Sequence, residues 1–456
     1  MSGVIRAALD AFFAEHPDIE FVEMVWPDMN GVMRGKWLPI GEIAKLGPRG
    51  QRLPVSTYAL DIFSQDTNAD GLAEKVGDPD GVASPLIHTL RPMLWSQRPA
   101  AQCLMTLTGD DWNSPNPHDP RAALARVLAR YRAAGLSPVA APELEFYLVE
   151  GEAAPSGRVR PPVGPGGRRL ESGQVYLLDV QRHFEPLLSE IEAAAVALDA
   201  LTTGFLAESG PGQFEVNLHH VDDALIAADR AIALRRAVRG TARAHGLDAC
   251  FMARPYGEAP GSGQHFHVSV LDEAGRNIFS GDDADTPNRP LSGAIGGVLA
   301  RMAESTLGFA PHLNSYRRLR PGGFAPSAAA WGLDNRNVAV RVPTAAGAGA
   351  RLEHRLAGAD ANPYIALTLI LAAILEGIET DAPPGLATDG AAPPEGAGAL
   401  PAGWREAIRL FEESAFVNEA LGEEFTRVYA AMKRQEADGF AARVSDVEHI
   451  VTARMI

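Results

Sequence analysis

Hydrophobic and polar positions alternate along several short segments of this chain, which predicts strands with one packed face and one polar face. In the segment 264–270, His265, His267 and Ser269 fall on one face, and the apolar residues between them fall on the other. A histidine pair in a single strand is usually structural. We predict a functional role for this polar face because the same pattern recurs elsewhere in the chain.

Four further segments carry ionisable residues on one face of an expected strand. They lie at 140–149, at 214–219 after the Gly-Pro-Gly turn that follows Glu208, at 338–342 and at 351–355. Buried charges need compensating partners, so these faces cannot all contact a dry core. We therefore expect a polar cavity lined by Glu143, Glu145, Glu215, His265, His267, Arg341, Arg351, Glu353 and Arg355.

The hydrophobic pattern of residues 1–112 predicts mainly β-strands. A helix at 4–15 precedes strands at 19–26 and 32–38, and the intervening Asn30-Gly31 is typical of a two-residue hairpin turn. The proline-rich segment 113–120 predicts a boundary between a small domain, residues 1–112, and a larger domain, residues 113–456.

Longer helices are expected in the larger domain, at 122–134, 184–201 and 223–245. A further apolar run covers 364–375. It is too short to cross a bilayer, which takes roughly 20 residues, so we interpret it as a core helix. The expectation is a protein that does not enter a membrane.

Composition narrows the class of partner. The chain has 41 basic and 57 acidic residues, a net charge of -16, which argues against nucleic-acid binding. Cys103 and Cys250 lie far apart and predict neither a disulfide framework nor a thiolate metal site. The N-terminus lacks a signal-peptide pattern, so we expect a cytoplasmic protein.

The ligand types indicate hard divalent ions. Carboxylates with imidazoles and without thiolates suit Mg²⁺ or Mn²⁺, and the acids suffice for two or more ions per active site. Neighbouring arginines add anion-binding groups, the combination expected for phosphoryl transfer from ATP. The common nucleotide-binding sequence motifs are absent, so a different fold must hold the nucleotide.

Ordered motifs across nearly the whole chain resemble the glutamine synthetase family. They are Pro-Glu-Leu-Glu-Phe at 142–146, the acidic segment 208–215, Gly-Ser-Gly-Gln-His-Phe-His-Val-Ser at 261–269, Asn-Ser-Tyr-Arg-Arg-Leu at 314–319 and Asn-Arg-Asn-Val-Ala-Val-Arg-Val-Pro at 335–343. The sequences at 31–36, 331–332 and 356–364 are most similar to those of the family members that ligate glutamate to polyamines, the γ-glutamylputrescine type.

The resemblance implies an α+β fold: a small N-terminal β-grasp domain and a large α/β catalytic domain whose antiparallel sheet forms a metal-lined funnel. It implies a homo-oligomer, a double-ring dodecamer. The metal ligands carried over are Glu145, Glu208 and Glu215 for one ion and Glu143, His265 and Glu353 for a second.

Substrate contacts are carried over in the same way. Arg336 and Arg341 correspond to catalytic, ATP-binding residues around the transferring phosphate. Further nucleotide contacts are expected at His267, Ser269 and Arg351, and glutamate contacts at Gly261, Arg318 and Arg355.

Three departures from the family pattern concern the substrates. Phe324 and Pro54 replace acids that surround ammonium in ammonia-using members. Pro260 replaces an asparagine beside Gly261 and weakens the assignment of a contact to the amino group of glutamate. Losing both acids favours an alkyl amine over bare ammonium. We predict an amine pocket at Pro54, Asp61 and Phe324, with Asp61 as a candidate for a second amino group.

The predicted function is ATP-dependent joining of the γ-carboxylate of L-glutamate to a primary amine, putrescine or another polyamine, through a γ-glutamyl phosphate. Two alternatives within the class stay open: a glutamine synthetase, and a γ-glutamyl-monoamine (methylamide, ethylamide or ethanolamide) synthetase. A third, more remote, is a ring-forming structural protein without turnover.

Overall fold

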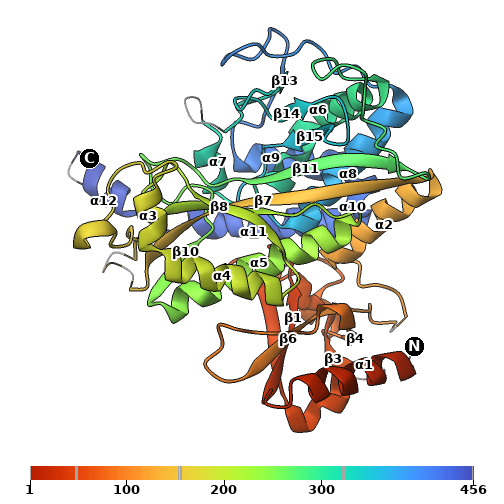
Figure 1. The fold of residues 1–456 in the computed structure, drawn as a ribbon, viewed down its shortest axis with the longest axis vertical. Helices are drawn as coiled ribbons and strands as arrows, with labels where there is room; N and C mark the ends of the chain where they lie inside the picture. The colour runs from red at the N-terminus through yellow and green to blue at the C-terminus, as the bar shows by residue number, and fades with distance from the viewer. Residues whose placement is uncertain are drawn as a thin grey trace.

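A computed structural model describes residues 2–46, 50–111, 113–152, 154, 157–320, 325–453 and 455–456. Two sheets organise the chain, and in Figure 1 the N-terminal sheet lies below the larger one. The N-terminal sheet has six strands in the order β2-β1-β6-β4-β3, with β5 paired to β6. These strands are β1 (Phe21–Pro27), β2 (Met33–Pro39), β3 (Gln51–Pro54), β4 (Asp80–Pro85), β5 (Arg91–Pro92) and β6 (Ala100–Leu107).

Helix α1 (Ser2–Glu15) packs on this sheet and confirms the predicted N-terminal helix. Leu9 of α1 joins Val22, Met24 and Cys103 in a core formed by residues of the first 107 positions. Short 3-10 helices connect the strands: η1 (Ile40–Leu46), η2 (Val55–Tyr58), η3 (Ala73–Val76) and η4 (Ile87–Thr89).

The predicted two-residue hairpin turn is wrong in detail. Strands β1 and β2 do pair antiparallel, but their last pair is Pro27 with Met33, which leaves a five-residue connection. Gly31 has a positive φ of 71°, whereas Asn30 is not among the described residues with positive φ. The longer loop lets the side chain of Asn30 turn inward, where it is 4% exposed.

The larger sheet has eight strands in the order β13-β14-β15-β11-β7-β9-β8, with β10 paired to β7. Its neighbours are antiparallel except for the β13–β14 pair. The strands are β7 (Leu136–Glu150), β8 (Thr202–Ala207), β9 (Gln213–Leu218), β10 (Leu247–Cys250), β11 (Gln264–Asp272), β13 (Trp331–Leu333), β14 (Val340–Thr344) and β15 (Arg351–His354). Two-residue strands β12 (Ala328–Ala329) and β16 (Gly398–Ala399) pair separately.

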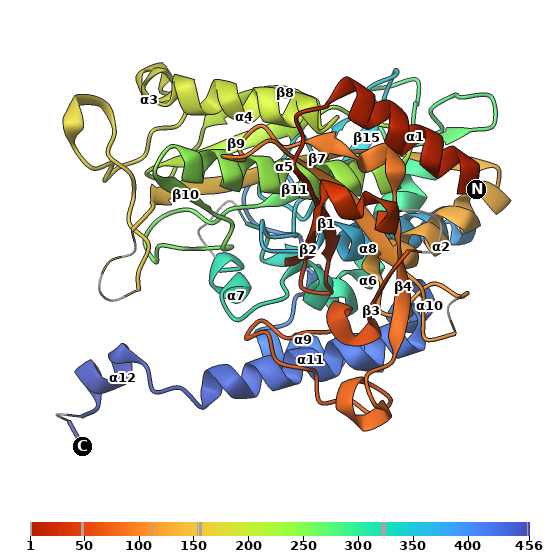
Figure 2. The same cartoon turned by 90° about the horizontal axis from the view of Figure 1, so that it is seen from below.

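Helices cover the apolar face of the large sheet. Leu144, Phe146 and Leu148 of β7 are buried with residues of α4 and α5, while Phe266 and Val268 of β11 join a core that contains α8. The helices are α2 (Pro120–Ala133), α3 (Leu178–His183), α4 (Glu185–Ala197), α5 (Ala224–Ala244), α6 (Arg289–Phe309), α7 (Ser315–Arg318), α8 (Pro363–Thr380), α9 (Trp404–Glu413), α10 (Ala415–Leu421), α11 (Glu423–Ala441) and α12 (Asp446–Val451), with η5 (Pro165–Gly167) in the 151–173 loop. Figure 2 shows α12 extending away from the rest of the fold.

Capping residues explain where two predicted helices begin. The carboxylate of Asp119 accepts from the backbone N–H of Arg121 at 2.8 Å at the start of α2, and Asp223 does the same for Leu225 at 2.9 Å in α5. The predicted helix at 184–201 ends early, at Ala197. Asp199 adopts a positive φ of 59°, which ends the helix and leads into the unanticipated strand β8.

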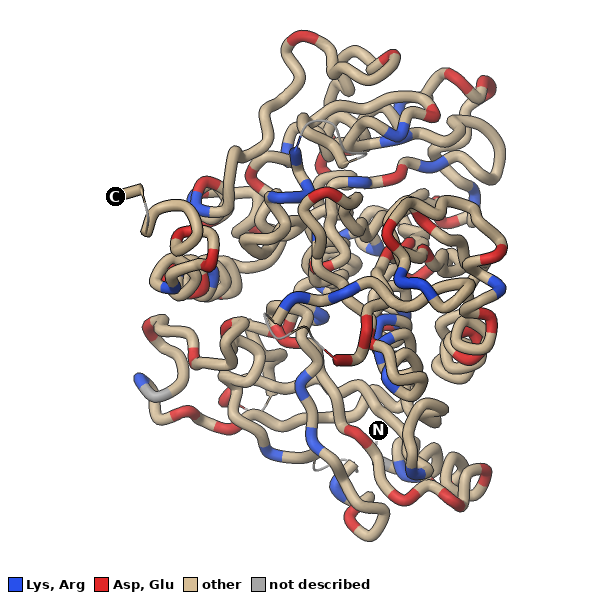
Figure 3. Tube along the Cα trace, turned by 90° about the vertical axis from the view of Figure 1, so that its left-hand side faces the viewer, with Lys and Arg blue, Asp and Glu red and all other residues tan. Residues whose placement is uncertain are grey.

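Helix α8 is long and apolar enough to cross a membrane by length and composition, but 78% of it is buried inside the protein. This burial confirms the predicted core helix. Acidic and basic positions are interspersed along the chain trace (Figure 3).

A buried polar cluster joins the β1–β2 connection to α11. Lys433 and Glu436 are both fully buried, with Lys433 Nζ 3.0 Å from Glu436 Oε2. Asn30 donates to Glu436 Oε1 at 2.8 Å and accepts from Lys433. Burial would raise the pKa of Glu436, but the charge of Lys433 and the hydrogen bond from His312 lower the pKa to about 2.

Removing the cation of this cluster should destabilise the fold strongly. Lys433→Met leaves Glu436 charged, buried and without its ammonium partner, which costs about 3–5 kcal/mol. The measurement is the free energy of unfolding in urea. Lys75→Met, which breaks the exposed Lys75–Asp70 pair, is the matched control and should change that free energy far less. Equal effects of the two substitutions would contradict the role given to the cluster.

Candidate active site

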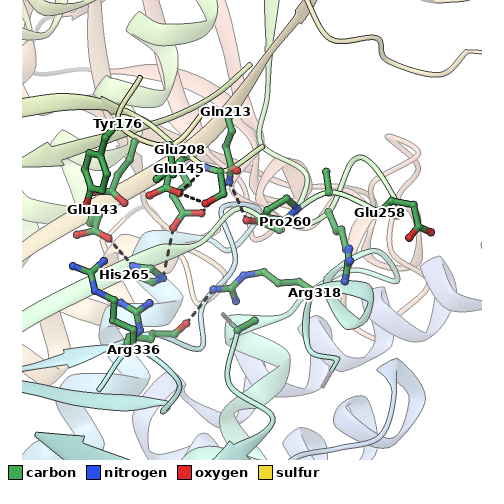
Figure 4. A pocket seen from close by; sticks show the side chains of 18 residues that line it. Glu143, Glu145, Tyr176, Glu208, Gln213, Glu258, Pro260, His265, Arg318 and Arg336 are labelled. Atoms are coloured by element: carbon green, nitrogen blue, oxygen red, sulfur yellow. Dashed lines mark hydrogen bonds and ion pairs between the residues drawn. The ribbon is translucent and has the colours of Figure 1, made fainter. Parts of the chain in front are cut away.

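A cavity of about 380 Å³ opens over the polar face of the large sheet. The predicted site residues that line it are Glu143, Glu145, Glu208, Glu215, Gly261, His265, Arg318, Arg336 and Arg355. Figure 4 shows acids and His265 together, with Arg318 and Arg336 nearby. The alternation in the sequence is thus realised: apolar residues of these strands face helices and the charged residues face the cavity.

Strand register creates the acidic centre. His265 of β11 pairs with Glu143 of β7, and Glu145 of β7 pairs with Glu215 of β9. His265 Nδ1 lies 2.7 Å from Glu143 Oε1, and His265 Nε2 lies 3.9 Å from Glu145 Oε1. Ligand atoms of Glu143, Glu145 and His265 all lie within 4.8 Å of one another, a spacing that can hold a metal ion.

Neutral groups fix the orientation of these acids. Gln213 is buried and donates to Glu145 Oε2 at 3.3 Å and to the carbonyl of Gly261 at 3.0 Å. Asn217 donates to Glu215 Oε1 at 2.9 Å. Glu208 follows β8 and accepts from the backbone N–H of Ser209 at 2.9 Å.

The acids repel one another in this cavity. Burial, together with the charges of Glu143 and Glu145, raises the pKa of Glu215 to about 9. Burial and the charge of Glu145 also raise the pKa of Glu208. Burial opposes ionisation of Glu143, but hydrogen bonds from His265 and His267 hold its pKa well below its usual value. A cation at this place would relieve the repulsion, so the donor set fits a divalent metal.

Glu353 is more enclosed than the other acids, with 1% of its side chain exposed. Its Oε1 is 3.6 Å from His265 Nδ1 and its Oε2 is 2.7 Å from Arg341 Nη1. Arg355 pairs with the same carboxylate. Burial would raise the pKa of Glu353, but the charges of Arg355 and His265 lower the pKa to about 2.

A second cavity, of about 360 Å³, collects the predicted nucleotide contacts His267, Ser269 and Arg351. Arg351 Nε donates to His267 Nδ1 at 3.2 Å. His267 Nε2 is also 3.6 Å from Glu143 Oε2. His267 therefore bridges the acidic centre and the second cavity.

Arg318 is held rigidly beside the acids. Its side chain is 5% exposed and donates to the carbonyls of Leu356 at 2.8 Å and Arg355 at 3.1 Å. A Cβ atom at Gly261 would lie 2.7 Å from Arg318 Cγ and 2.6 Å from the carbonyl of Ala253. Glycine at this position therefore permits the close approach of the 261 loop to Arg318.

The sequence and the fold of this chain are similar to those of known proteins. The family described as "Glutamine synthetase, catalytic domain" matches residues 117–451. Gamma-glutamylputrescine synthetase PuuA of Escherichia coli (strain K12) is 36% identical over 96% of this chain and 92% of its own. Gamma-glutamylethanolamide synthetase GlnA4 of Streptomyces coelicolor is 32% identical over 94% and 92%. A solved structure titled "GmaS/ADP complex-Conformation 1" superposes with a TM-score of 0.82 at 29% identity, covering 97% of this chain and 99% of that chain.

The chain belongs to the glutamine synthetase family. Its fold is the α+β arrangement of that family, and the prediction of an ATP-dependent glutamate–amine ligase is confirmed. The nature of the amine is a separate question, because the relatives are named for different amines.

Two of the three predicted amine residues, Pro54 and Asp61, lie away from this cavity. Pro54 ends β3 in the N-terminal sheet, and neither it nor Asp61 is among the described residues that line the cavity. Asp61 is buried with both oxygens in use: Oδ1 accepts from the N–H groups of Phe63 and Gln65, and Oδ2 accepts from Gln435 at 2.8 Å. Phe324 lies outside the described residues.

The sequence pattern did not predict every lining residue. Gln213, Tyr176, Arg254 and Glu258 line the cavity of this family member in addition to the predicted set. The alternation of β9 places Gln213 on the acidic face, so the pattern does contain a signal for that residue. The other three lie in irregular loops, where no periodicity marks a residue as facing a cavity.

The raised pKa values predict a pH dependence of metal binding. Below pH 9 Glu215 holds a proton in the metal-free protein, and binding must expel that proton. The association constant for Mn²⁺ should therefore rise with pH between 6 and 9, by up to about tenfold per unit for each proton released. Calorimetric titration in buffers of different ionisation enthalpy counts those protons.

The matched variant is Glu215→Gln, which cannot release a proton. It should bind Mn²⁺ more weakly and with a shallower pH dependence than the unaltered protein. An unaltered protein whose Mn²⁺ affinity does not change between pH 6 and 9 would refute the assignment of Glu215 to the metal site.

Proposed function

We propose that this protein uses ATP to join the γ-carboxylate of L-glutamate to a primary amine of putrescine or another polyamine. The observation that supports the proposal is one cavity in which the ligand atoms of Glu143, Glu145 and His265 are spaced closely enough to hold a cation, with Arg318 and Arg336 nearby as potential anion-binding groups. Such a pairing suits a reaction that brings phosphate and carboxylate groups together.

The cation would be Mg²⁺ or Mn²⁺, two or more per site. The oxygen and imidazole donors suit these ions. We assign Glu145, Glu208 and Glu215 to one ion and Glu143, His265 and Glu353 to another. When bound, such ions neutralise phosphate oxygens and polarise the transferring phosphoryl group. The compact Glu143–Glu145–His265 group takes ligands from both sets, so the two sites would adjoin.

The chain's own residues then position the reactants. Arg318 and Arg355, with the backbone at Gly261, would hold glutamate so that its γ-carboxylate oxygen attacks the terminal phosphorus of ATP, with ADP leaving. Arg336 and Arg341 would face the phosphoryl group, where preorganised positive charge lowers the barrier. Attack of the neutral amine on the γ-glutamyl phosphate forms the amide and releases phosphate and a proton.

The nucleotide would occupy the cavity lined by His267, Ser269 and Arg351. Support comes from their gathering beside the acidic centre and from the similarity to a structure whose title names an ADP complex. Arg351, whose pKa is lowered by burial, lines this cavity and is linked to the acidic centre through its hydrogen bond to His267.

The polyamine assignment rests on the similarity to PuuA and on the loss of both ammonium-binding acids, with Pro54 and Phe324 in their places. The similarity to GlnA4 keeps a γ-glutamyl-monoamine synthetase as the second candidate. Ammonia as the acceptor is the third alternative.

Several finer features belong to the same proposal. The N-terminal sheet with α1 would be a β-grasp domain spanning residues 1–112, and its separate core supports that boundary. The polar face of the large sheet would form the metal-lined funnel. We also propose a cytoplasmic homo-oligomer, a double-ring dodecamer.

The acceptor is tested with an amine panel. Purified protein given ATP, Mg²⁺ and L-glutamate should release phosphate when putrescine, spermidine, butylamine, ethanolamine, methylamine or ammonium is added in turn. We expect the highest kcat/KM with a polyamine. Faster turnover with ammonium or with any monoamine would overturn the polyamine assignment. If no amine of the panel causes phosphate release, the ligase proposal is overturned.

The metal assignment has its own test in Glu208→Gln. Among the described residues, the Glu208 side chain accepts hydrogen bonds only from its neighbour Ser209, so the substitution should leave the fold intact. We expect kcat to fall about 100-fold or more. Circular dichroism checks the fold and phosphate release measures kcat. Glu192→Gln on the exposed surface of α4 is the matched control and should behave as the unaltered protein. Full activity of Glu208→Gln would contradict its role as a ligand.

A further inference from the structure

One carboxylate in the cavity stands apart from the metal group. Glu258 lines the same cavity, and Figure 4 shows it at the opposite end from Glu143, with Pro260 between them. Its side chain is exposed and makes no hydrogen bond or ion pair with the part of the chain that the structure describes. A negative charge without a partner at the outer end of the cavity is available to a ligand.

The loop that carries Glu258 is held in place. Its base is closed by the N–H of Ser262, which donates to the carbonyl of Ala253 at 2.8 Å. Tyr147 donates its hydroxyl hydrogen to the carbonyl of Pro260 at 2.7 Å, and the Tyr256 ring packs edge-on against Tyr147 with centroids 5.3 Å apart. These contacts hold the loop backbone, so the Glu258 side chain extends from a fixed backbone position.

The lining near Glu258 includes apolar groups. Ala259 and Pro260 follow Glu258 in the loop and line the same cavity. From the acidic centre outward the cavity therefore offers a reaction site, apolar surface and then one carboxylate. A linear diamine has the complementary order: a reacting amine, a run of methylenes and a second ammonium.

We propose that Glu258 binds the distal ammonium of a diamine acceptor and so determines specificity. This inference rests on the proposed function, and it names a residue in place of Asp61, whose oxygens are already in use. The neutral proximal amine would lie at the γ-carboxylate of glutamate, while the charged distal amine pairs with Glu258. A monoamine of equal length lacks the second contact.

The neighbouring Arg254 does not form an ion pair with Glu258 in the part of the chain that the structure describes. Arg254 also lines the cavity, but its Nη1 donates to the carbonyl of Arg317 at 2.9 Å, and its backbone N–H donates to Asn314 Oδ1 at 2.8 Å. No ion pair joins it to Glu258 among the described residues. The guanidinium is thus held by the 314–317 segment, and Glu258 keeps its charge available.

The test compares butane-1,4-diamine with butylamine, which share a four-carbon chain. The readout is the ratio of their kcat/KM values, measured by phosphate release with saturating ATP and glutamate. Glu258→Gln should lower that ratio about tenfold, the effect of losing one charged hydrogen bond. The lost selectivity should reside in KM for the diamine. Glu258→Lys should lower the ratio further because it repels the distal ammonium.

Glu192→Gln, on the exposed surface of α4, is the matched control and should leave the ratio unchanged. A wild-type ratio at or below one, an unchanged ratio in Glu258→Gln, or an equal loss with both amines would overturn the inference while leaving the ligase proposal standing. Failure of the unaltered protein to turn over either amine would overturn the inference, and failure with every amine of the panel would overturn the ligase proposal as well.

Discussion

Repulsion among carboxylates is the constraint on which this structure depends. Strands β7 and β9 bring Glu143, Glu145 and Glu215 into one cavity, and burial together with the charges of Glu143 and Glu145 raises the pKa of Glu215 to about 9. The fold tolerates this because the opposite faces of the same strands are buried against helices. The apolar packing holds the acids in an arrangement that is unfavourable until a cation binds, which is how a protein prepares a metal site.

Positive groups around this centre divide into two kinds. Arg341 and Arg355 pair with Glu353, and the charges of Arg355 and His265 lower the pKa of Glu353 to about 2, so that carboxylate stays ionised although it is buried. Arg336 lines the cavity, where it can meet an anionic substrate. The arrangement places anionic and cationic side chains next to one another, as a reaction between carboxylate and phosphate groups requires.

Local sequence predicted much of this site because strands have a period of two. That period alone places Glu143 with Glu145, and His265 with His267, on shared strand faces. Which strands pair is a long-range property, so the contact of His265 with Glu143 could not follow from periodicity. The hydrogen bonds of Asn30 and Asp61 could not be predicted for the same reason, because their partners lie in α11, about 400 residues away in the sequence. Glu258 sits in a loop without a repeating pattern.

Transfer of an oxygen isotope tests the central claim most directly. If the γ-carboxylate attacks the terminal phosphorus of ATP, L-glutamate labelled with ¹⁸O in that carboxylate must donate one labelled oxygen to the phosphate released in each turnover. Mass spectrometry of the phosphate and of the γ-glutamyl amide measures both products. The account predicts one ¹⁸O atom per phosphate. Unlabelled phosphate accompanying amide formation would contradict the γ-glutamyl phosphate and the role given to this cavity.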